Sequence, residues 1–337
     1  MVRHSNFMPS KATKEKKQLV IDAGNGNVKA SVLGETEVIP SVLSQNCGDY
    51  IRGGFKWGED EHWVLGWDNT GRIDKLEVIN RDNGKLEYLP HLLAGTISAM
   101  RHVIDPRDNI DVHVLTLNND KRSLIETAVQ KAAVDLSVDG EPLNLKLSLK
   151  NVYPEGYGAS LHAAKVYDGS TRVAVLDIGN GTCNLSQYHV GRAGMPRREI
   201  FRPIPFGVSS IVKNTVELYR NETSNGSVNE GLIRQALTTN TYRYLSTYDG
   251  VDIRDVTKRA VEVWLDSPEV HQLMIQTVAL LQQKVPVVLC GGGFAIDVVK
   301  DEVICRLAGN APDETFLNVP TSPATLGVVG LAEVLHG

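Results

Sequence analysis

One short pattern occurs twice in this chain and constrains its fold more than any other feature. VIDAGNGNVKASVLG begins at Val20, and VLDIGNGTCNLSQYHVG begins at Val175. Both contain apolar residues, an Asp, one further residue and Gly-Asn-Gly, followed by a second strand-like segment. The two aspartates, Asp22 and Asp177, are 155 residues apart. This distance is too long for a solenoid repeat and predicts a duplicated lobe that opens with a strand, an Asp and a glycine turn.

The length and the order of the elements favour an α/β protein with two lobes. A chain of 337 residues, 42% of them hydrophobic, can bury a large core and is long enough for two domains. The patterns predict strands at 18–22, 28–33, 111–117, 143–152, 172–177, 183–190 and 286–290. They predict helices at 86–103, 121–133, 156–166, 207–219, 229–237, 253–284 (with a break at Ser267-Pro268) and 295–307. This alternation predicts a mixed sheet in each half.

Composition argues against several classes of protein. Apolar runs such as VAVLDIG are far shorter than a membrane span, so we expect a soluble, cytoplasmic protein with no membrane partner. Cys47, Cys183, Cys290 and Cys305 lack CxxC spacing and indicate neither a disulfide framework nor a zinc site. Residues 1–17 contain five Lys or Arg and one Glu, which predicts a disordered basic tail. The rest of the chain then carries a net charge of about −9, which argues against broad nucleic-acid affinity.

The two glycine turns allow two interpretations. A turn that contacts a phosphate needs glycine where a Cβ would collide and where φ is positive. The turn glycines that meet this need are Gly24, Gly26, Gly179 and Gly181. The alternative is a plain type I′ hairpin, for which Asn-Gly is the strongest signal. The Asp before each turn favours the phosphate site, because Mg²⁺ held through waters beside a polyphosphate needs such carboxylates.

Three further features are candidates for the same site. Lys29 could reach an outer phosphate or could be an exposed strand lysine. A strand leads into Gly291-Gly292-Gly293 and a helix, an arrangement that lets backbone approach a nucleotide. Glu155 could orient an attacking water or could be an ordinary first-turn Glu. The sequence contains neither GxxxxGK[ST] nor an ordered GxGxxG with a later acidic residue, so we expect neither a P-loop nor a dinucleotide fold.

These elements, in this order, resemble the actin, heat-shock chaperone and sugar-kinase superfamily of ATPases. DAGNGNVKA is similar to its first phosphate motif, DIGNGTCNL to its second and CGGGFAIDV to its adenosine motif. SPATLGVVGLAEVL resembles its second connecting helix, in which Ala and Gly permit close crossing of the first. VIPSVLS, YPEGYGA, FGVSSIVKNTV and VNEGLIRQAL with TYRY are similar to the bacterial plasmid-segregation ParM/StbA group. The resemblance covers residues 18–337.

The resemblance implies a two-lobed actin-like fold with a nucleotide cleft between the lobes. Each lobe would contain a ribonuclease H-like mixed β-sheet flanked by helices. Domain I would span 18–168, with the C-terminal helix 324–337 returning to it, and domain II would span 169–323.

The resemblance also implies an ATP hydrolase that binds ATP and Mg²⁺, polymerises head to tail with itself and moves plasmid DNA through a DNA-binding adaptor. Asp22 and Asp177 would hold Mg²⁺ through water, and Glu155 would complete the catalytic set by positioning the hydrolytic water. The residues implied to contact the nucleotide are Gly24, Asn25, Gly26, Asn27, Lys29, Gly179, Asn180, Gly181, Thr182, Gly291, Gly292, Gly293 and Phe294.

Two positions depart from the pattern of the superfamily. Many members have Ser or Thr where Asn25 stands, and Gly is common where Asn180 stands, so the phosphate contacts differ in detail. Two other functions stay open. A small-molecule kinase of the same superfamily would need an acceptor site that the sequence does not assign, and a nucleotide-gated scaffold would bind ATP without turnover. The choice between ATP and GTP is open as well.

Overall fold

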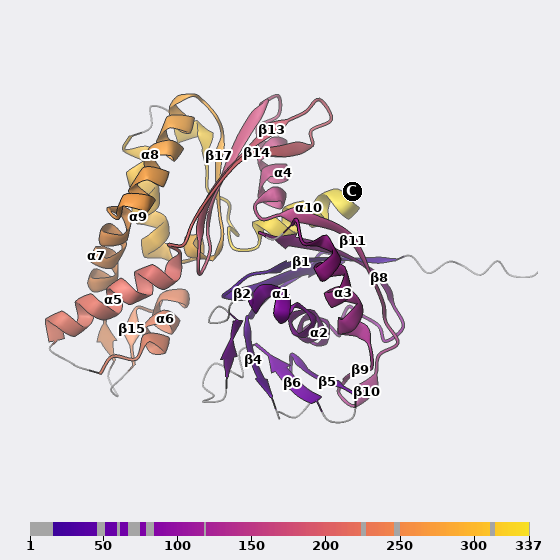
Figure 1. Cartoon of the computed structure of the whole chain (residues 1–337). Coiled ribbons are helices and arrows are strands. Elements are labelled where there is room, and N and C mark those ends of the chain that lie inside the picture. Colours follow the sequence, from indigo (N-terminus) through magenta and orange to yellow (C-terminus); the bar gives the residue numbers. More distant parts are fainter. Residues whose placement is uncertain are drawn as a thin grey trace, which may run out of the picture.

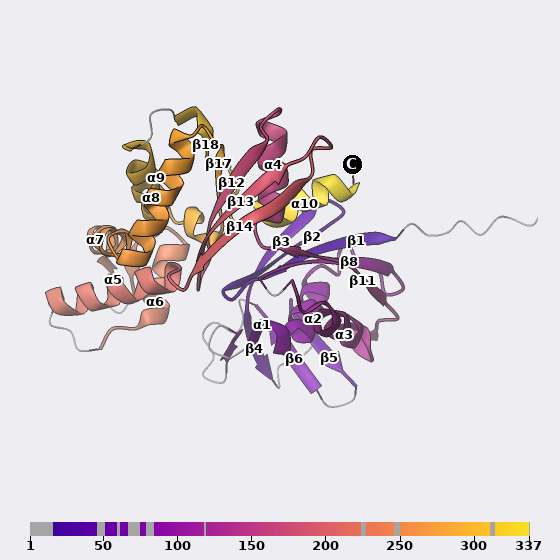
Figure 2. The same cartoon turned by 45° about the horizontal axis from the view of Figure 1, so that its top comes forward.

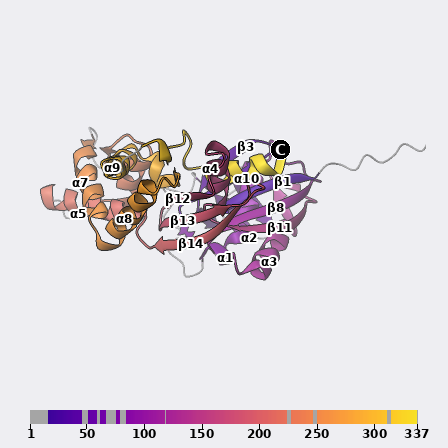
Figure 3. The same ribbon diagram turned by 90° about the horizontal axis from the view of Figure 1, so that it is seen from above.

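Two lobes lie side by side in the computed structural model, with helices α4 and α10 between them (Figures 1 and 3). The structure describes residues 16–45, 51–58, 61–66, 75–78, 84–117, 119–223, 227–245, 250–310 and 314–336. The basic residues up to position 15 and Cys47 lie outside these ranges. Lys17 begins the first strand, which corrects the predicted end of the tail at 17. Its ammonium lies 2.6 Å from the carboxylate of Asp108, so this lysine is part of the folded lobe.

The first lobe is built on a five-stranded mixed sheet with the order β11-β8-β1-β2-β3. Its strands are β1 (Lys17–Ala23), β2 (Asn27–Val32), β3 (Glu35–Pro40), β8 (Asn109–Thr116) and β11 (Lys146–Pro154). Strand β1 pairs antiparallel with β2 and parallel with β8. The turn between β1 and β2 is the first of the two predicted glycine turns.

A second, six-stranded sheet completes the first lobe, in the order β10-β9-β5-β6-β4-β7. Its strands are β4 (Val42–Gln45), β5 (Gly54–Trp57), β6 (Glu61–Leu65), β7 (Leu76–Glu77), β9 (Leu136–Val138) and β10 (Glu141–Pro142). The helices of this lobe are α1 (Gly84–Glu87), α2 (Leu89–Ala99) and α3 (Arg122–Ala133). One hydrophobic core joins both sheets to α2 and α3 through residues such as Leu19, Phe55 and Leu92. The prediction of a single helix at 86–103 is wrong. The segment forms two helices, α1 and α2, which are interrupted just before Pro90, and α2 ends at Ala99.

The second lobe repeats the central arrangement of the first. Its five-stranded sheet has the order β14-β13-β12-β17-β18. The strands are β12 (Arg172–Ile178), β13 (Cys183–Val190), β14 (Pro196–Ile204), β17 (Val287–Cys290) and β18 (Leu317–Asn318). Strand β12 pairs antiparallel with β13 and parallel with β17, as β1 does with β2 and β8. The sequence repeat is therefore also a repeat of strand topology.

Helices form the outer part of the second lobe (Figure 2). They are α5 (Val208–Thr223), α6 (Glu230–Thr238), α7 (Arg254–Leu265), α8 (Pro268–Gln282) and α9 (Asp297–Ala308), with a short ribbon of β15 (Arg243–Tyr244) and β16 (Val251–Asp252). Single turns of 3₁₀ helix span Gly292–Ala295 and Glu314–Phe316. The predicted break at Ser267-Pro268 separates α7 from α8. The core of this lobe includes Leu176, Trp264 and Phe294.

Two helices cross between the lobes at glycine. They are α4 (Tyr157–Val166) and α10 (Leu326–His336). A Cβ on Gly158 would lie 1.8 Å from the carbonyl oxygen of Gly327, and a Cβ on Gly330 would lie 2.3 Å from that of Gly158. The predicted close crossing of the two helices is confirmed. Helix α10 also packs on β1, while the exact domain boundaries at 168 and 323 stay a prediction.

Candidate functional site

Both glycine turns open into one cleft between the lobes. The cleft is partly open to solvent. The predicted site residues that line it are Asp22, Gly24, Asn25, Gly26, Asn27, Lys29, Glu155, Asp177, Gly179, Asn180, Gly181, Thr182 and Gly292. The structure therefore brings together residues from β1, β2, β12, the end of β11 and the loop after β17.

Neither turn is a type I′ hairpin. That turn requires a positive φ at both central residues, and no described residue of 24–27 or 179–182 has one. In the first turn, the glycines are needed for space instead. A Cβ on Gly24 would lie 2.5 Å from the carbonyl oxygen of Asn27, and a Cβ on Gly26 would lie 2.6 Å from the Cβ of Asn180. The predicted steric reason for glycine is confirmed at Gly24 and Gly26, whereas a Cβ on Gly179 would lie 3.3 Å from the carbonyl oxygen of Thr182. The predicted conformational reason is wrong.

The carbonyl groups of each turn accept hydrogen bonds from neighbouring residues. In the first turn, Ser41 donates from its N–H to the Gly26 oxygen at 3.0 Å and from its hydroxyl to the Gly24 oxygen at 2.7 Å. In the second turn, the N–H groups of Val208 and Ser209 donate to the oxygens of Gly179 and Asn180 at 3.0 and 2.8 Å. Val208 and Ser209 open α5, so the first turn of that helix positions the second glycine turn.

Two carboxylates and one ammonium lie at the base of the cleft. Lys29 donates to Oδ2 of Asp22 at 3.2 Å, and the two residues are cross-strand partners on β1 and β2. Burial lowers the pKa of Lys29, but the negative charges of Asp22 and Asp177 raise it by more. The pKa of Lys29 therefore lies above its ordinary value. Burial raises the pKa of Asp177 to about 6, against the opposing effect of Lys29. Asp177 is thus a carboxylate whose charge the folded protein stabilises poorly.

The base of the cleft has oxygen atoms that could face a hydrated cation. Oδ1 of Asp22 is buried without a hydrogen-bond partner, and so is Oδ1 of Asn184. Asn184 is the cross-strand partner of Asp177 and also lines the cleft. Carboxylate and amide oxygens are the ligands that Mg²⁺ uses, together with waters. Within the described ranges, no group of three or more His, Cys, Asp or Glu is placed to hold a metal ion.

Glu155 has a partner that the sequence analysis missed. Lys85 of α1 donates to its carboxylate at 2.7 Å, and the exposed fractions of the two side chains are only 13% and 11%. Burial lowers the pKa of Lys85, but Glu155 and Asp22 more than compensate and raise it. Lys85 and Glu155 are separated by 70 residues, so no local pattern joins them. The cleft therefore contains a second buried ion pair beside that of Asp22 and Lys29.

The glycine run after β17 lies mostly behind the cleft wall. Gly292 lines the cleft, and a Cβ there would meet nothing within 4 Å. A Cβ on Gly291 would lie 2.2 Å from Oδ1 of Asp177, and one on Gly293 would lie 2.4 Å from the side chain of Ile178. Phe294 is 1% exposed and packs in the core of the second lobe. The structure thus does not bring Gly291, Gly293 or the Phe294 side chain to the cleft surface.

Other cleft residues were not predicted. They are Lys85, Asn184, Val208, Thr238 and Ile296. Only Asn184 carried a usable signal in the sequence. It lies just after the second turn, at the strand position opposite Asp177. The described cysteines Cys183, Cys290 and Cys305 are free thiols. No helix in the described part of the chain combines the length and apolar character that crossing a bilayer requires.

No family model matches this chain, and no curated protein matches it. Solved structures do match. A 15-stranded ParM filament from Clostridium botulinum superposes with a TM-score of 0.73 at 14% identity, over 95% of this chain and 99% of the other. An archaeal actin homologue in complex with ADP gives 0.70 at 14% identity, over 95% and 99%. ParM from Bacillus thuringiensis with AMPPNP gives 0.63 at 12% identity, over 96% and 99%. The chain has the two-lobed actin-like fold of the ParM type, as the sequence predicts.

Proposed function

We propose that this protein is an actin-like ATPase that binds ATP with Mg²⁺ between its lobes and hydrolyses it. One observation carries the proposal: Asp22, Lys29 and Asp177 come from three strands of two sheets, and together with Glu155, which follows β11, they line one cleft. The fold supports a nucleotide as the ligand, because similar structures include complexes with ADP and AMPPNP. ATP is the nucleotide to which we commit, with GTP as the competitor to be tested.

The two turns are proposed to bind the outer phosphates. Mg²⁺ would be held through waters by Asp22 and Asp177, and it would neutralise charge on the phosphate oxygens. Lys29 would contact the same oxygens from β2, together with backbone N–H groups of the two turns. We place the adenosine against Gly292, with Thr238 and Ile296 beside it, because these residues line the same cleft.

Glu155 is proposed to orient the attacking water. In the structure its carboxylate is neutralised by Lys85. A terminal phosphate carries more charge than this carboxylate and competes with it for the ammonium. Entry of ATP would therefore draw Lys85 towards the phosphate and leave Glu155 free to accept a hydrogen bond from water. The ion pair would keep the water-positioning group inactive until ATP enters.

We further propose that nucleotide state controls assembly into cytoplasmic filaments, which separate plasmid DNA through a DNA-binding adaptor. The two phosphate turns belong to different lobes, so a nucleotide that contacts both would favour a closed arrangement. The similar structure from Clostridium botulinum is itself a filament, which supports self-assembly. Domain I would comprise 18–168 with 324–337, and domain II 169–323.

The test of the ATPase is Glu155→Ala, with the exposed Glu126→Ala on α3 as the matched control. Wild type and Glu126→Ala should release phosphate from ATP with Mg²⁺, whereas Glu155→Ala should bind AMPPNP but release phosphate at least about 100-fold more slowly. Binding without turnover in wild type would favour the scaffold. Turnover only with an added sugar or acid would favour the small-molecule kinase.

Assembly is tested separately by light scattering, pelleting and electron microscopy with and without ATP and Mg²⁺. We expect filaments only with the nucleotide. Absence of assembly at tens of micromolar protein would refute the filament part of the proposal and leave the ATPase part intact.

A further inference from the structure

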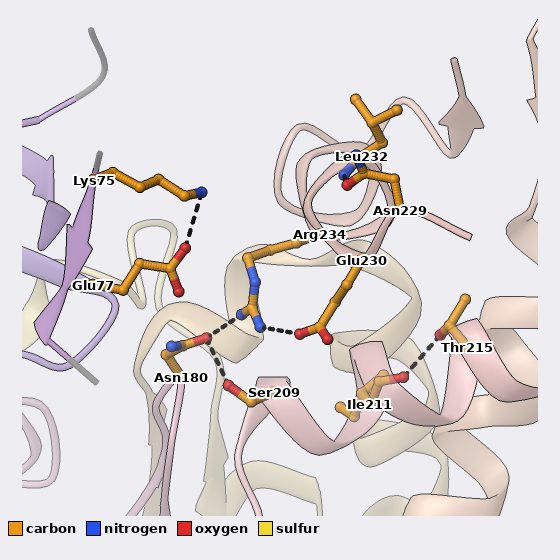
Figure 4. Close-up of polar contacts among 10 residues, drawn as sticks. All are labelled: Lys75, Glu77, Asn180, Ser209, Ile211, Thr215, Asn229, Glu230, Leu232 and Arg234. Carbon is orange, nitrogen blue, oxygen red and sulfur yellow. Dashed lines mark hydrogen bonds and ion pairs between the residues drawn. The ribbon is translucent and has the colours of Figure 1, made fainter. Parts of the chain in front are cut away.

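The side chain of Asn180 is held in one orientation by two neighbours. Its Oδ1 accepts a hydrogen bond from Nη1 of Arg234 at 2.6 Å and another from the hydroxyl of Ser209 at 3.2 Å. A guanidinium can only donate, so the atom that faces Arg234 must be the amide oxygen. The amide nitrogen must then face the other way. Figure 4 shows this arrangement, with the nitrogen of Asn180 on the side opposite to Arg234 and Ser209.

The freed amide nitrogen lies beside the first phosphate turn. A Cβ on Gly26 would lie 3.1 Å from Nδ2 of Asn180 and 2.6 Å from its Cβ. Asn180 therefore fills the space next to Gly26, where the turn of one lobe meets the turn of the other. Both residues line the cleft. The N–H₂ group is an oriented donor at the place where both turns could reach one phosphate.

Arg234 contributes charge as well as orientation. It lies on α6 and also pairs with Glu230 of the same helix at 3.1 Å. A charged donor on the amide oxygen polarises the amide and strengthens its N–H groups as donors. The positive charge of Arg234 thus acts on the cleft through Asn180, although Arg234 itself does not line it.

We propose that Asn180 donates from Nδ2 to the terminal phosphate of ATP, and that Arg234 is a positioning residue that sets the preference for ATP over ADP through this amide. The proposal rests on the proposed nucleotide site. It explains why this chain has Asn at this position, since a glycine there could neither contact the terminal phosphate with a side chain nor respond to Arg234. It also explains why residue 26 is a glycine, since a Cβ there would collide with Asn180 of the opposite lobe.

The decisive variant is Asn180→Asp. It has the same shape, and its carboxylate can still accept from Arg234 and Ser209, so the fold is preserved. It has no N–H to donate and presents an oxygen to the phosphate. Calorimetric titration with AMPPNP and ADP, both with Mg²⁺, should show that the AMPPNP affinity falls at least tenfold more than the ADP affinity.

The role of Arg234 is tested by the same measurement, the ratio of the AMPPNP affinity to the ADP affinity. Arg234→Gln should lower the preference for AMPPNP over ADP severalfold, and Arg234→Lys, which keeps a charged donor, should restore it in part. Glu230→Gln removes the other partner of Arg234 and is the matched control, with an unchanged ratio. In an Asn180→Ala background, Arg234→Gln should no longer change the ratio, because the amide through which it acts is absent.

The outcomes separate the two proposals. If wild type binds neither AMPPNP nor ADP, the proposed nucleotide site itself fails. If wild type binds both and Asn180→Asp leaves their ratio unchanged, the nucleotide site stands and this inference is overturned. An equal loss for both nucleotides together with a lower melting temperature would assign Asn180 and Arg234 a structural role only, and would also overturn it.

Discussion

Replacing Asp177 by asparagine tests whether the cleft is built at a cost to stability. Asp177 lies next to the last residue of β12, at the base of the cleft, and burial raises its pKa from 3.8 to about 6. Lys29 and a hydrogen bond from Cys290 oppose this effect but do not cancel it. At neutral pH the folded protein therefore holds a carboxylate charge that the unfolded chain solvates better. The neutral amide of the Asp177→Asn variant would avoid this cost.

The size of the gain follows from the pKa difference. A shift from 3.8 to about 6 corresponds to about 3 kcal/mol at pH 7, since one pKa unit is about 1.4 kcal/mol. A raised carboxyl pKa contributes stability that is complete below about pH 4 and is lost as the pH rises through about 6. This shift already includes the attraction to Lys29, so we expect Asp177→Asn to raise the free energy of unfolding by up to about 3 kcal/mol at pH 7.

The assay is guanidinium unfolding with EDTA and without nucleotide, at pH 7 and pH 5. At pH 5 wild-type Asp177 is mostly protonated, and the gain should fall to about half of its value at pH 7. Asp22→Asn is the matched control. It removes a carboxylate that accepts from Lys29 at 3.2 Å, so it should give no gain. A variant at Asp177 that is no more stable than wild type at pH 7, or equally stabilised at both pH values, would refute this reasoning.

Two further predictions concern the other buried ion pair and the helix crossing. Lys85→Met keeps the length of the side chain but removes the ammonium beside Glu155, and it should lower the rate of phosphate release about 100-fold with little change in ADP affinity; equal losses in both would contradict the role proposed for Lys85. Gly158→Ala should cost about 3 kcal/mol or more in unfolding free energy, because its Cβ would lie 1.8 Å from the Gly327 oxygen. Gly327→Ala, whose Cβ would meet only Leu115 at 3.9 Å, should stay within about 1 kcal/mol of wild type in the same denaturation experiment.

Local patterns were sufficient for the central elements of each lobe. The strand predicted at 183–190 coincides with β13, and the break at Ser267-Pro268 separates two helices. These segments carry strong signals, namely buried apolar residues at strand spacing and a proline at a helix start. The six-stranded sheet was not predicted, because its strands are two to five residues long and are formed by pairing between distant segments. Strand β14 is mostly exposed and lacks apolar alternation, so it too was missed.

The candidate site was predicted where it depends on motifs and missed where it depends on tertiary contacts. The repeated Asp and glycine turn placed both carboxylates correctly in one cleft. Lys85 could not be found, because its contact with Glu155 requires α1 to pack near the end of β11. Phe294 was expected at the nucleotide because CGGGFAIDV resembles an adenosine motif, but a large apolar side chain gains more from the core, where it lies. Sequence spacing does not show which of these side chains faces the cleft.

The duplication also explains why the two turns are not equivalent. Each turn follows a strand with one antiparallel and one parallel neighbour, so Asp22 and Asp177 occupy matching positions. The supports differ, however. The first turn is held by Ser41 after β3, whereas the second is held by the start of α5 and, through Asn180, by Arg234 of α6. If the two lobes move relative to each other, the second turn should therefore move together with α5 and α6, and the first turn should move together with the sheet that contains β3. The two movements meet where Gly26 faces Asn180. Under the proposed function, the influence of a bound nucleotide on lobe closure should be greatest at this contact.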